Sequence, residues 1–373
     1  MESAPTGSSH QTPEEPGHER LQYLQNREQS NVYRTPEARA AVREFEKVLL
    51  GSNRQMRRRE AAEQADVSLL TARKVWRALG FPNIDDDEVF FTPSDCEALA
   101  TIVGLNRSHE LEEESTISIT RSVGQLTDRM VAWQIETLVE DIVKTKGYTD
   151  SQARQELLTL LPELIEELEA ILLYGYRRQL SAAVLRLALR SDQNDANDPS
   201  LLPLVRGVGF ADLVSYTSLS RRMNEKNLTE LVKTFEQRCA EVVAAGGGRI
   251  IKTIGDEVMF LTETPEAAAQ ISMALSKEIQ SDPHLPDARV AFVWGRILPK
   301  LGDIYGPSVN LASRLVAVAD PGVVVTDKIT ADTLENDPRF VLTPQRVRDI
   351  RGFGEIWPVA LTPGIGNELE IDF

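Results

Sequence analysis

Hydrophobic residues follow helical spacing through the first half of the chain, with charged and polar residues at the positions between them. The stretch 57–81 predicts two short helices joined by a turn at Asp66–Val67. A third helix is predicted after Pro93, because proline suits the first turn of a helix. Two longer amphipathic helices are predicted around 123–143 and 150–189. The first half is therefore predicted to be all-α.

The last of these helices carries a stripe of leucine and isoleucine residues with glutamates between them. The apolar positions of the stripe are Leu157, Leu160, Leu161, Leu164, Ile165, Leu168, Ile171 and Leu172. Such a stripe is typical of core packing, and also of a helix used for dimerisation or switching. Pro162 has no backbone N–H, so we expect it to kink the helix or split it in two.

The second half of the chain alternates between β-type and helical patterns. The predicted order is strand 205–211, helix 227–244, a hairpin of strands 249–254 and 257–261, helix 265–281 and strand 288–294. This βαββαβ order predicts an α+β domain of the ferredoxin-like plan, with an antiparallel sheet and helices on one face. A short polar stretch, SDQNDANDPS, separates it from the helical half.

Composition narrows the class of protein. A chain of 373 residues predicts two folded domains, and a net charge of −16 argues against nucleic-acid binding over the whole surface. Cys96 and Cys239 lie one in each half, which predicts no disulfide framework and a reducing compartment. The four histidines are scattered, which argues against a zinc site. No apolar segment suits a membrane span or a signal peptide, so we expect a cytoplasmic protein.

Two aspartates occupy matching positions at the ends of apolar strands. Asp212 lies in FADLVSYT, and Asp256 lies in the tight turn of IIKTIGDEVMF. Either aspartate alone is typical of a turn or a helix cap. Two carboxylates at neighbouring strand ends can instead share hard divalent cations such as Mg²⁺ or Mn²⁺, which leave coordination positions open for substrate phosphates.

A second cluster of polar residues follows in GDIYGPSVNLASRL. Asp303 precedes a Gly–Pro turn, and Asn310 and Arg314 lie four residues apart on one face of the next helix. An amide and a guanidinium so placed can bind one phosphate together, and the guanidinium can stabilise charge on a transferring phosphoryl group. The alternative interpretation is a surface arginine capped by a neighbouring asparagine.

These motifs, in this order, resemble the catalytic domain of the class III nucleotidyl cyclases, the family of adenylate and guanylate cyclases, over residues 205–361. FADLVSYT resembles the first metal-binding motif of that family, and GDEV resembles the second. The resemblance implies that Asp212 and Asp256 bind two Mg²⁺ or Mn²⁺ ions per active site, together with the backbone carbonyl of Leu213. The interval between the two aspartates accommodates one helix and one strand, as this fold requires.

The resemblance also implies how the substrate is bound. Lys252 and Asp303 fall on the positions that select the purine, where a lysine can donate to N1 of adenine and a carboxylate can accept from its exocyclic amine. Guanylate cyclases usually carry Glu and Cys at these positions, so ATP is the implied substrate. Asn310 and Arg314 fall on the pair that orients the ribose and stabilises the transition state. Arg296 resembles a further phosphate-binding arginine.

The implied reaction is an in-line attack of the ribose 3′-hydroxyl on the α-phosphorus, with pyrophosphate as the leaving group and Asp212 as the candidate proton acceptor. Family geometry implies a homodimer with active sites across the interface, the aspartates of one subunit facing the nucleotide-binding residues of another. One departure concerns the triphosphate. The segment DIRGFGE has Phe353 where many members have a lysine, and Arg351 is the candidate substitute.

In the first half, residues 57–96 resemble the helix-turn-helix of MerR-type regulators, in the stretches ARKVWRALGF and FTPSDCEAL. The local excess of arginine suits phosphate contacts, but such units also serve as packing modules, and the acidic segment IDDDE follows. A structural or regulatory role is therefore favoured over DNA binding. The whole arrangement resembles actinobacterial soluble cyclases with an N-terminal helical regulatory domain, and we hypothesise that this domain restrains the catalytic dimer.

The predicted organisation is a disordered segment 1–32, a helical regulatory domain 33–190, a linker 191–202, a cyclase catalytic domain 203–363 and a C-terminal tail 364–373. Two alternative functions stay open. One is a diguanylate cyclase, whose GGDEF turn corresponds to IGDEV here, and the missing second glycine argues against it. The other is a DNA-binding regulator with a nucleotide-sensing domain, against which the retained aspartates and Asn–Arg pair argue.

Overall fold

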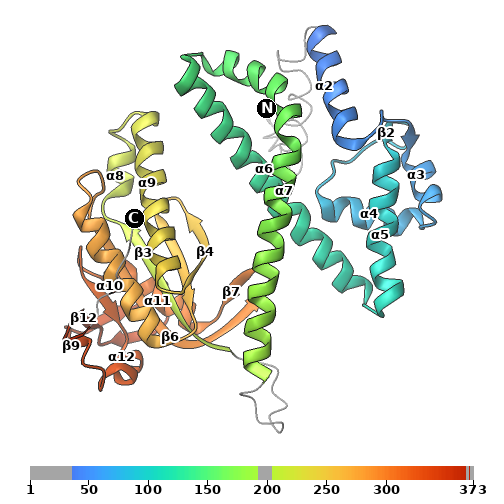
Figure 1. Ribbon diagram of the computed structural model, residues 1–373. Helices are drawn as coiled ribbons and strands as arrows, with labels where there is room; N and C mark the ends of the chain where they lie inside the picture. Colours follow the sequence, from blue (N-terminus) through green and yellow to red (C-terminus); the bar gives the residue numbers. More distant parts are fainter. Residues whose placement is uncertain (1–35, 192–203, 367–368, 370–373) are drawn as a thin grey trace, which may run out of the picture. The chain divides into compact units, whose positions relative to one another are not determined.

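The computed structural model describes residues 36–191, 204–366 and 369 (Figure 1). The predicted disordered segment 1–32 lies outside the described residues. All but the first residue of the predicted linker 191–202 also lies outside them. The secondary structure and the packing within each half can therefore be compared with the predictions over the remainder of the chain.

The chain divides into two compact units, Met1–Gln193 and Asn194–Phe373. The described elements of the first unit are α2 (Pro36–Leu50), β1 (Met56–Arg57), α3 (Arg58–Gln64), α4 (Leu69–Leu79), β2 (Val89–Phe91), α5 (Pro93–His109), α6 (Glu113–Lys146) and α7 (Asp150–Ser191). The prediction of an all-α unit is wrong in one detail, since β1 and β2 pair as a small antiparallel sheet. Strands of two and three residues are too short to produce a periodic pattern.

The predicted pair of short helices in the first unit is confirmed, and local capping explains where the helices begin and end. Ser68 accepts a hydrogen bond from the N–H of Thr71 at the start of α4, and Gly80 ends this helix with a φ of 90°. Thr92 and Asp95 form a capping box at the start of α5. These capping residues can be recognised in the sequence, so the predicted helix ends lie close to the observed ones.

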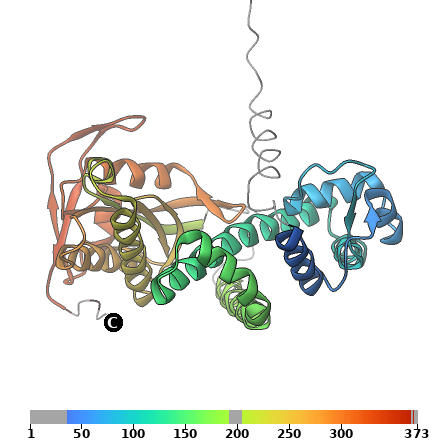
Figure 2. The same ribbon diagram turned by 90° about the horizontal axis from the view of Figure 1, so that it is seen from above.

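The core of the first unit lies between α3, α4, α5 and the small sheet. Trp76 of α4 stacks on Phe91 of β2 with ring centroids 4.3 Å apart. Helix α6 packs closely against α4, because a Cβ atom on Gly124 would lie 2.6 Å from the carbonyl oxygen of Leu79. Figure 2 shows α3, α4 and α5 gathered beside α6. The contact between Gly124 and Leu79 requires glycine, since any larger residue would push α4 and α6 apart.

A kink or a split was predicted at Pro162, and the split is wrong because helix α7 is continuous through this proline. Pro162 is exposed, and water can satisfy the carbonyl that loses its hydrogen-bond partner there. The apolar stripe divides into two parts. Leu157 and Leu161 are buried against α6, which confirms core packing for the first turns. Ile171 and Leu172 are 65% and 41% exposed, so the second part of the stripe lies on an open face.

The second unit is built around one large sheet with the strand order β4-β5-β3-β6-β8-β12-β9. Its elements are β3 (Leu204–Leu213), α8 (Tyr216–Ser220), α9 (Glu225–Ala245), β4 (Arg249–Ile254), β5 (Glu257–Thr262), α10 (Pro265–Ser281), β6 (Ala288–Lys300), β7 (Asp303–Tyr305), α11 (Pro307–Val318), β8 (Val324–Thr326), α12 (Lys328–Leu334), β9 (Phe340–Pro344), β10 (Arg348–Ile350), β11 (Gly354–Ile356) and β12 (Val359–Pro363). The predicted antiparallel βαββαβ core is confirmed for β3, β4, β5 and β6. Strand β8 joins β6 in parallel, so the complete sheet is mixed.

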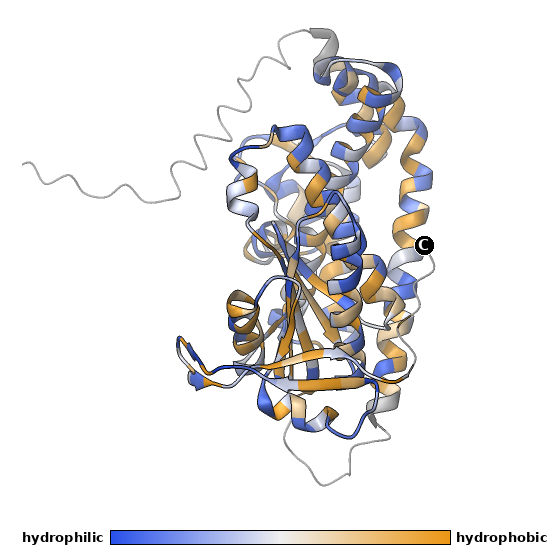
Figure 3. Cartoon of the chain, turned by 90° about the vertical axis from the view of Figure 1, so that its left-hand side faces the viewer, coloured by the Kyte–Doolittle hydropathy of each residue, from blue (hydrophilic) through white to orange (hydrophobic). Residues whose placement is uncertain are grey.

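The two helices of the predicted βαββαβ order, α9 and α10, lie on one face of this sheet as predicted, and the later helix α11 covers the other face. Phe235 of α9 and Leu275 of α10 share one core cluster, whereas Leu315 of α11 belongs to a second cluster. Along β3, Val208 and Phe210 face the α11 cluster, while alternate residues face α9 and α10. The central strands accordingly carry hydrophobic residues on both faces, and much of their length is coloured as hydrophobic in Figure 3.

Both cysteines are free and buried, Cys96 in the first unit and Cys239 in the second. No helix in the described part of the chain has both the length and the apolar composition needed to cross a membrane. In the predicted C-terminal tail, the Gly364 and Ile365 N–H groups donate to the carbonyls of Arg339 and Pro338, at 2.8 and 2.7 Å. The first residues of this tail are therefore part of the folded second unit.

Candidate active site

One end of the central sheet carries both of the predicted metal-binding aspartates. Asp212 is the penultimate residue of β3, and Asp256 lies in the tight turn between β4 and β5, where Gly255 adopts a φ of +64°. The Leu213 N–H donates to the carbonyl oxygen of Asp256 at 3.1 Å. This backbone hydrogen bond joins the end of β3 to the turn between β4 and β5. The structure therefore brings the two aspartates together at one end of the sheet.

The surroundings of Asp212 suit a bound cation. Burial is the largest cause that raises the pKa of Asp212 to about 6, and the negative charge of Asp256 raises it further. Arg289 opposes this shift from the other side, with its Nη1 atom 3.9 Å from the Asp212 carboxylate. Two half-buried carboxylates so arranged repel each other, and a divalent cation between them would relieve that repulsion. The carboxylates of Asp212 and Asp256 are therefore suitable ligands for the predicted metal ions.

No group of three or more His, Cys, Asp or Glu residues suited to a metal occurs among the described residues. A cation at this end of the sheet would therefore take its ligands from two carboxylates and backbone carbonyls, and water and substrate oxygens would complete its coordination. The predicted carbonyl of Leu213 lies next to Asp212 on the same strand. Such a partly filled coordination sphere is typical of cations that also hold substrate phosphates.

Two further charged residues adjoin the aspartates, and sequence reasoning missed both. Glu257 lies opposite Asp212 in the β3–β5 pairing, and Arg289 lies opposite Asp212 in the β3–β6 pairing. Burial, followed by the charges of Asp212 and Asp256, raises the pKa of Glu257. Glu257 could have been noticed from its position in GDEV. Arg289 could not, because only the strand register places it beside Asp212.

The raised pKa of Asp212 predicts that Asp212→Asn stabilises the metal-free protein at neutral pH. Its folded pKa of about 6 exceeds the usual value, so its ionisation disfavours folding as pH rises through about 6. We expect the free energy of unfolding in EDTA at pH 7.5 to increase by about 1–2 kcal/mol, after allowance for partial solvent exposure. Urea denaturation measures this change, and the difference should shrink towards pH 5.

A matched control is Asp320→Asn, which alters an exposed aspartate outside this cluster and should leave the free energy of unfolding unchanged. If Asp212→Asn destabilised the metal-free protein at pH 7.5, this result would contradict the conclusion that the ionised Asp212 carboxylate disfavours folding.

The predicted purine-selecting residues meet in the folded chain. The Lys252 Nζ atom of β4 donates to Asp303 Oδ2 of β7 at 2.6 Å, and the Ile304 N–H donates to Asp303 Oδ1 at 2.8 Å. Both side chains are partly exposed. The predicted strand ending at Trp294 extends to Lys300 in the structure, and this extension of β6 pairs with β7. The position of Asp303 therefore depends on a strand that is longer than the sequence indicated.

Asn310 and Arg314 lie on the exposed side of α11, one helical turn apart. The Asn310 N–H donates to the carbonyl of Gly306 at 3.1 Å, which fixes the first turn of the helix. Arg296 is exposed on β6. In the described part of the chain, no hydrogen bond or ion pair joins the side chains of Asn310 and Arg314 to each other or to the two aspartates. Both side chains are thus accessible to a ligand.

The departure at the predicted triphosphate-binding position has a structural reason. Phe353 packs against the core cluster under α11, in the turn between β10 and β11. Arg351 lies in the same turn and is exposed. An apolar residue at position 353 therefore contributes to packing, and Arg351 is the basic group of this turn that a phosphate can reach.

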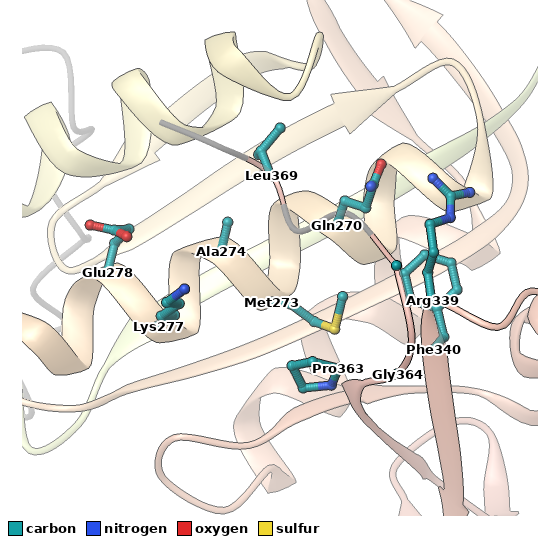
Figure 4. A pocket seen from close by; sticks show the side chains of 11 residues that line it. Gln270, Met273, Ala274, Lys277, Glu278, Arg339, Phe340, Pro363, Gly364 and Leu369 are labelled. Atoms are coloured by element: carbon teal, nitrogen blue, oxygen red, sulfur yellow. The ribbon is translucent and has the colours of Figure 1, made fainter. Parts of the chain in front are cut away.

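A separate pocket of about 70 Å³ lies between α10 and the C-terminal segment (Figure 4). Met273 and Ala274 of α10 line it, together with Phe340 of β9 and Leu369. None of the predicted site residues lines this pocket. It therefore belongs to the packing of the C-terminal segment and is distinct from the candidate active site.

Paired carboxylates at one end of the sheet, a Lys–Asp pair that joins β4 to β7 and an exposed Asn–Arg pair match the arrangement expected for a nucleotidyl cyclase. No protein-family model matches the chain. The chain is 56% identical over 348 residues to an adenylate cyclase of Glutamicibacter nicotianae, covering 91% of this chain and 86% of that protein. It is 35% identical over 346 residues to an adenylate cyclase of Streptomyces coelicolor, covering 85% and 88%. The chain belongs to the adenylate cyclase family.

Among solved structures, the adenylyl cyclase CyaB from P. aeruginosa is similar over 44% of this chain and 98% of that chain. The sequence identity is 20%, and the TM-score is 0.39.

Proposed function

We propose that this protein converts ATP to 3′,5′-cyclic AMP and pyrophosphate. The observation that carries the proposal is the Lys252–Asp303 pair, in which a donor on β4 and an acceptor on β7 lie 2.6 Å apart. This pair presents a cation and a carboxylate side by side, which complements N1 and the exocyclic amine of adenine. Relatives named adenylate cyclase at 56% and 35% identity support the same reaction.

In this proposal Lys252 donates to N1 of the base, and Asp303 accepts from its amine. The mutual contact of the two side chains holds them in place before the nucleotide enters, which reduces the entropy lost on binding. Guanine would present a carbonyl and an N–H at these positions, and both side chains would then face groups of the wrong polarity. Such mismatches of buried polar groups give large discrimination between substrates.

Asp212 and Asp256 would hold two Mg²⁺ or Mn²⁺ ions, with the carbonyl of Leu213 as a further ligand. Divalent cations bound there supply Lewis-acid activation of the ribose 3′-hydroxyl and neutralise phosphate charge. Asn310 orients the ribose, and Arg314 stabilises the charge that develops on the α-phosphate. The bond from O3′ to the α-phosphorus forms as the bond from that phosphorus to the bridging β-phosphate oxygen breaks, and pyrophosphate leaves. Asp212 is the candidate acceptor of the 3′-hydroxyl proton. Arg296 and Arg351 are the candidates for binding the remaining phosphates.

The direct test supplies purified full-length protein with ATP and either Mg²⁺ or Mn²⁺, and measures cyclic AMP and pyrophosphate. We expect the two products in equal amounts. Formation of cyclic di-GMP from GTP would instead identify the diguanylate cyclase alternative. Absence of turnover with both ions, together with saturable nucleotide binding, would favour a nucleotide-sensing regulator.

We also propose that the active protein is a homodimer whose two sites lie across the interface. Mixing Asp212→Ala chains with Asn310→Ala chains in equal amounts should restore activity, because one site in each mixed dimer then has all of its residues. With random association, we expect about a quarter of wild-type activity, while each variant alone stays inactive. The measurement is cyclic AMP formation after co-refolding or co-expression.

The matched control for this experiment mixes Asp212→Ala with Asp256→Ala. Both changes remove metal ligands from the same half-site, so every site in the mixed dimer lacks one aspartate and no activity should return. Recovery in this control, or no recovery in the first mixture, would contradict sites shared between subunits.

The remaining proposal concerns regulation by residues 33–190. Helix α7 reaches Ser191, next to the catalytic unit in sequence, and its second part carries exposed apolar side chains such as Ile171 and Leu185. We expect a fragment starting at Leu201 to differ from the full-length protein in cyclic AMP formation per site, because the restraint on the dimer is lost. Equal rates for fragment and full-length chain across protein concentrations would exclude this role.

A further inference from the structure

A cleft in the first unit lies between α4 and the segment that leads to β2. Its walls include three arginines, Arg58, Arg73 and Arg77, and the aromatic side chains of Trp76 and Phe91. Its volume is about 160 Å³. These residues lie in a different unit from the candidate active site, and the proposed cyclase chemistry uses none of them. We call this feature the arginine cleft.

The arginine cleft carries excess positive charge. Arg58 Nη1 and Arg73 Nη2 both donate to the carboxylate of Asp86, at 2.9 and 3.2 Å. One carboxylate thus serves two guanidinium groups. Arg77 lies one helical turn after Arg73 and forms no ion pair within the part of the chain that the structure describes. The residues that line the cleft include three arginines and no acidic residue, which makes the cleft attractive to an anion.

Arg73 also presents a hydrogen-bond donor that is not satisfied by the protein. Its Nε atom is buried and has no hydrogen-bond partner among the described residues. A buried donor without an acceptor costs free energy, and native proteins rarely leave one unpaired. Because this Nε atom is shielded from solvent, a ligand oxygen in the cleft would accept from the Nη atoms of Arg73, whose side chain is 37% exposed, and from the exposed guanidinium of Arg77. The two arginines would then bind one anionic group in the geometry that guanidinium groups prefer.

The apolar wall of the cleft consists of packed aromatic side chains close to the arginines. Trp76 is 5% exposed and Phe91 is fully buried, and their stacked rings lie 4.3 Å apart. Phe81 adds a third aromatic side chain. An apolar cavity of about 150 Å³ is large enough to bind benzene, so the arginine cleft can hold one ring beside its charged wall. The size and the lining together favour a ligand with a ring-sized apolar body.

We propose that the arginine cleft binds a small organic anion, in which a phosphate or carboxylate group is attached to an aromatic ring. Arg73 and Arg77 bind the anionic group, and Trp76 and Phe81 contact the ring. Duplex DNA fits the same residues less well, because Arg58 is 8% exposed and bonded to Asp86 inside the cleft. A guanidinium held inside a cleft cannot reach the phosphates of a convex duplex.

The test titrates full-length protein with phenyl phosphate, benzoate and inorganic phosphate by calorimetry, and follows Trp fluorescence in parallel. We expect saturable binding of one ring-bearing anion per chain and weaker binding of inorganic phosphate. Arg73→Gln and Arg77→Gln should each weaken the binding by about tenfold or more. Comparison of phenyl phosphate with benzoate identifies which anionic group the cleft prefers. Arg77 is exposed, so its replacement leaves the fold intact.

The matched control is Arg107→Gln, which removes an exposed arginine from the same unit, where it pairs with Asp66 at 3.7 Å. This variant should bind the ring-bearing anion like the wild-type protein. Equal binding by all three variants would place the anion elsewhere and overturn the proposal, as would the absence of binding by the wild-type protein. Duplex DNA binding that is lost in Arg77→Gln, without binding of either small anion, would also overturn it.

Discussion

Asp256→Asn is expected to reduce cyclic AMP formation by about a thousandfold or more, with either Mg²⁺ or Mn²⁺, because a metal-binding carboxylate is lost. The side chains have nearly the same shape. The backbone carbonyl that accepts from the Leu213 N–H is unchanged, so the turn between β4 and β5 should keep its conformation. The loss would therefore report on the carboxylate charge. Single-turnover assays of product formation at saturating ATP measure the effect.

The control for Asp256→Asn is Asp287→Asn, which lies near the same end of β3. The carbonyl of Asp287 accepts from the Val214 N–H at 2.8 Å, and its side chain is exposed. This variant removes one negative charge from the same region and should retain wild-type activity. If Asp256→Asn kept more than about a tenth of the activity, the two-carboxylate metal site would be wrong.

The second large effect concerns the choice of nucleotide. Replacing both Lys252→Glu and Asp303→Cys should lower kcat/KM for ATP by about a thousandfold and raise kcat/KM for GTP. Glutamate can accept from the N–H of guanine, and the thiol can donate to its carbonyl. Each single change would leave one member of the 2.6 Å ion pair without its partner, so the double variant should be the better GTP enzyme. Paired assays of cyclic AMP and cyclic GMP measure the ratio.

A suitable control for the charge change is Lys226→Glu, on the exposed surface of α9. It reverses a lysine charge in the same unit and should leave the preference for ATP unchanged. If the double variant lost activity with both nucleotides while its thermal stability was normal, Lys252 and Asp303 would have a different role from selecting the base.

The sequence predicted elements well where the signals were local. The predicted helix 265–281 coincides with α10, since Thr264 caps it, Pro265 begins it, and its apolar residues repeat at helical spacing. The hairpin of β4 and β5 was also predicted, because Gly255 marks the turn. The parallel position of β8 and the opposite face taken by α11 were not predicted, because both depend on contacts between distant segments.

The candidate site shows the same difference between local sequence signals and contacts between distant segments. The sequence by itself determined which residues could carry the chemistry, including Asp212, Asp256, Asn310 and Arg314, because motif composition and spacing are local properties of the chain. Only the tertiary structure decided that Lys252 contacts Asp303, which lies 51 positions further along the chain, and that Arg289 lies beside Asp212. These contacts depend on strand register and on how helices pack on the sheet. A sequence pattern specifies neither the register nor the helix packing, since both are fixed by the packing of the folded unit as a whole.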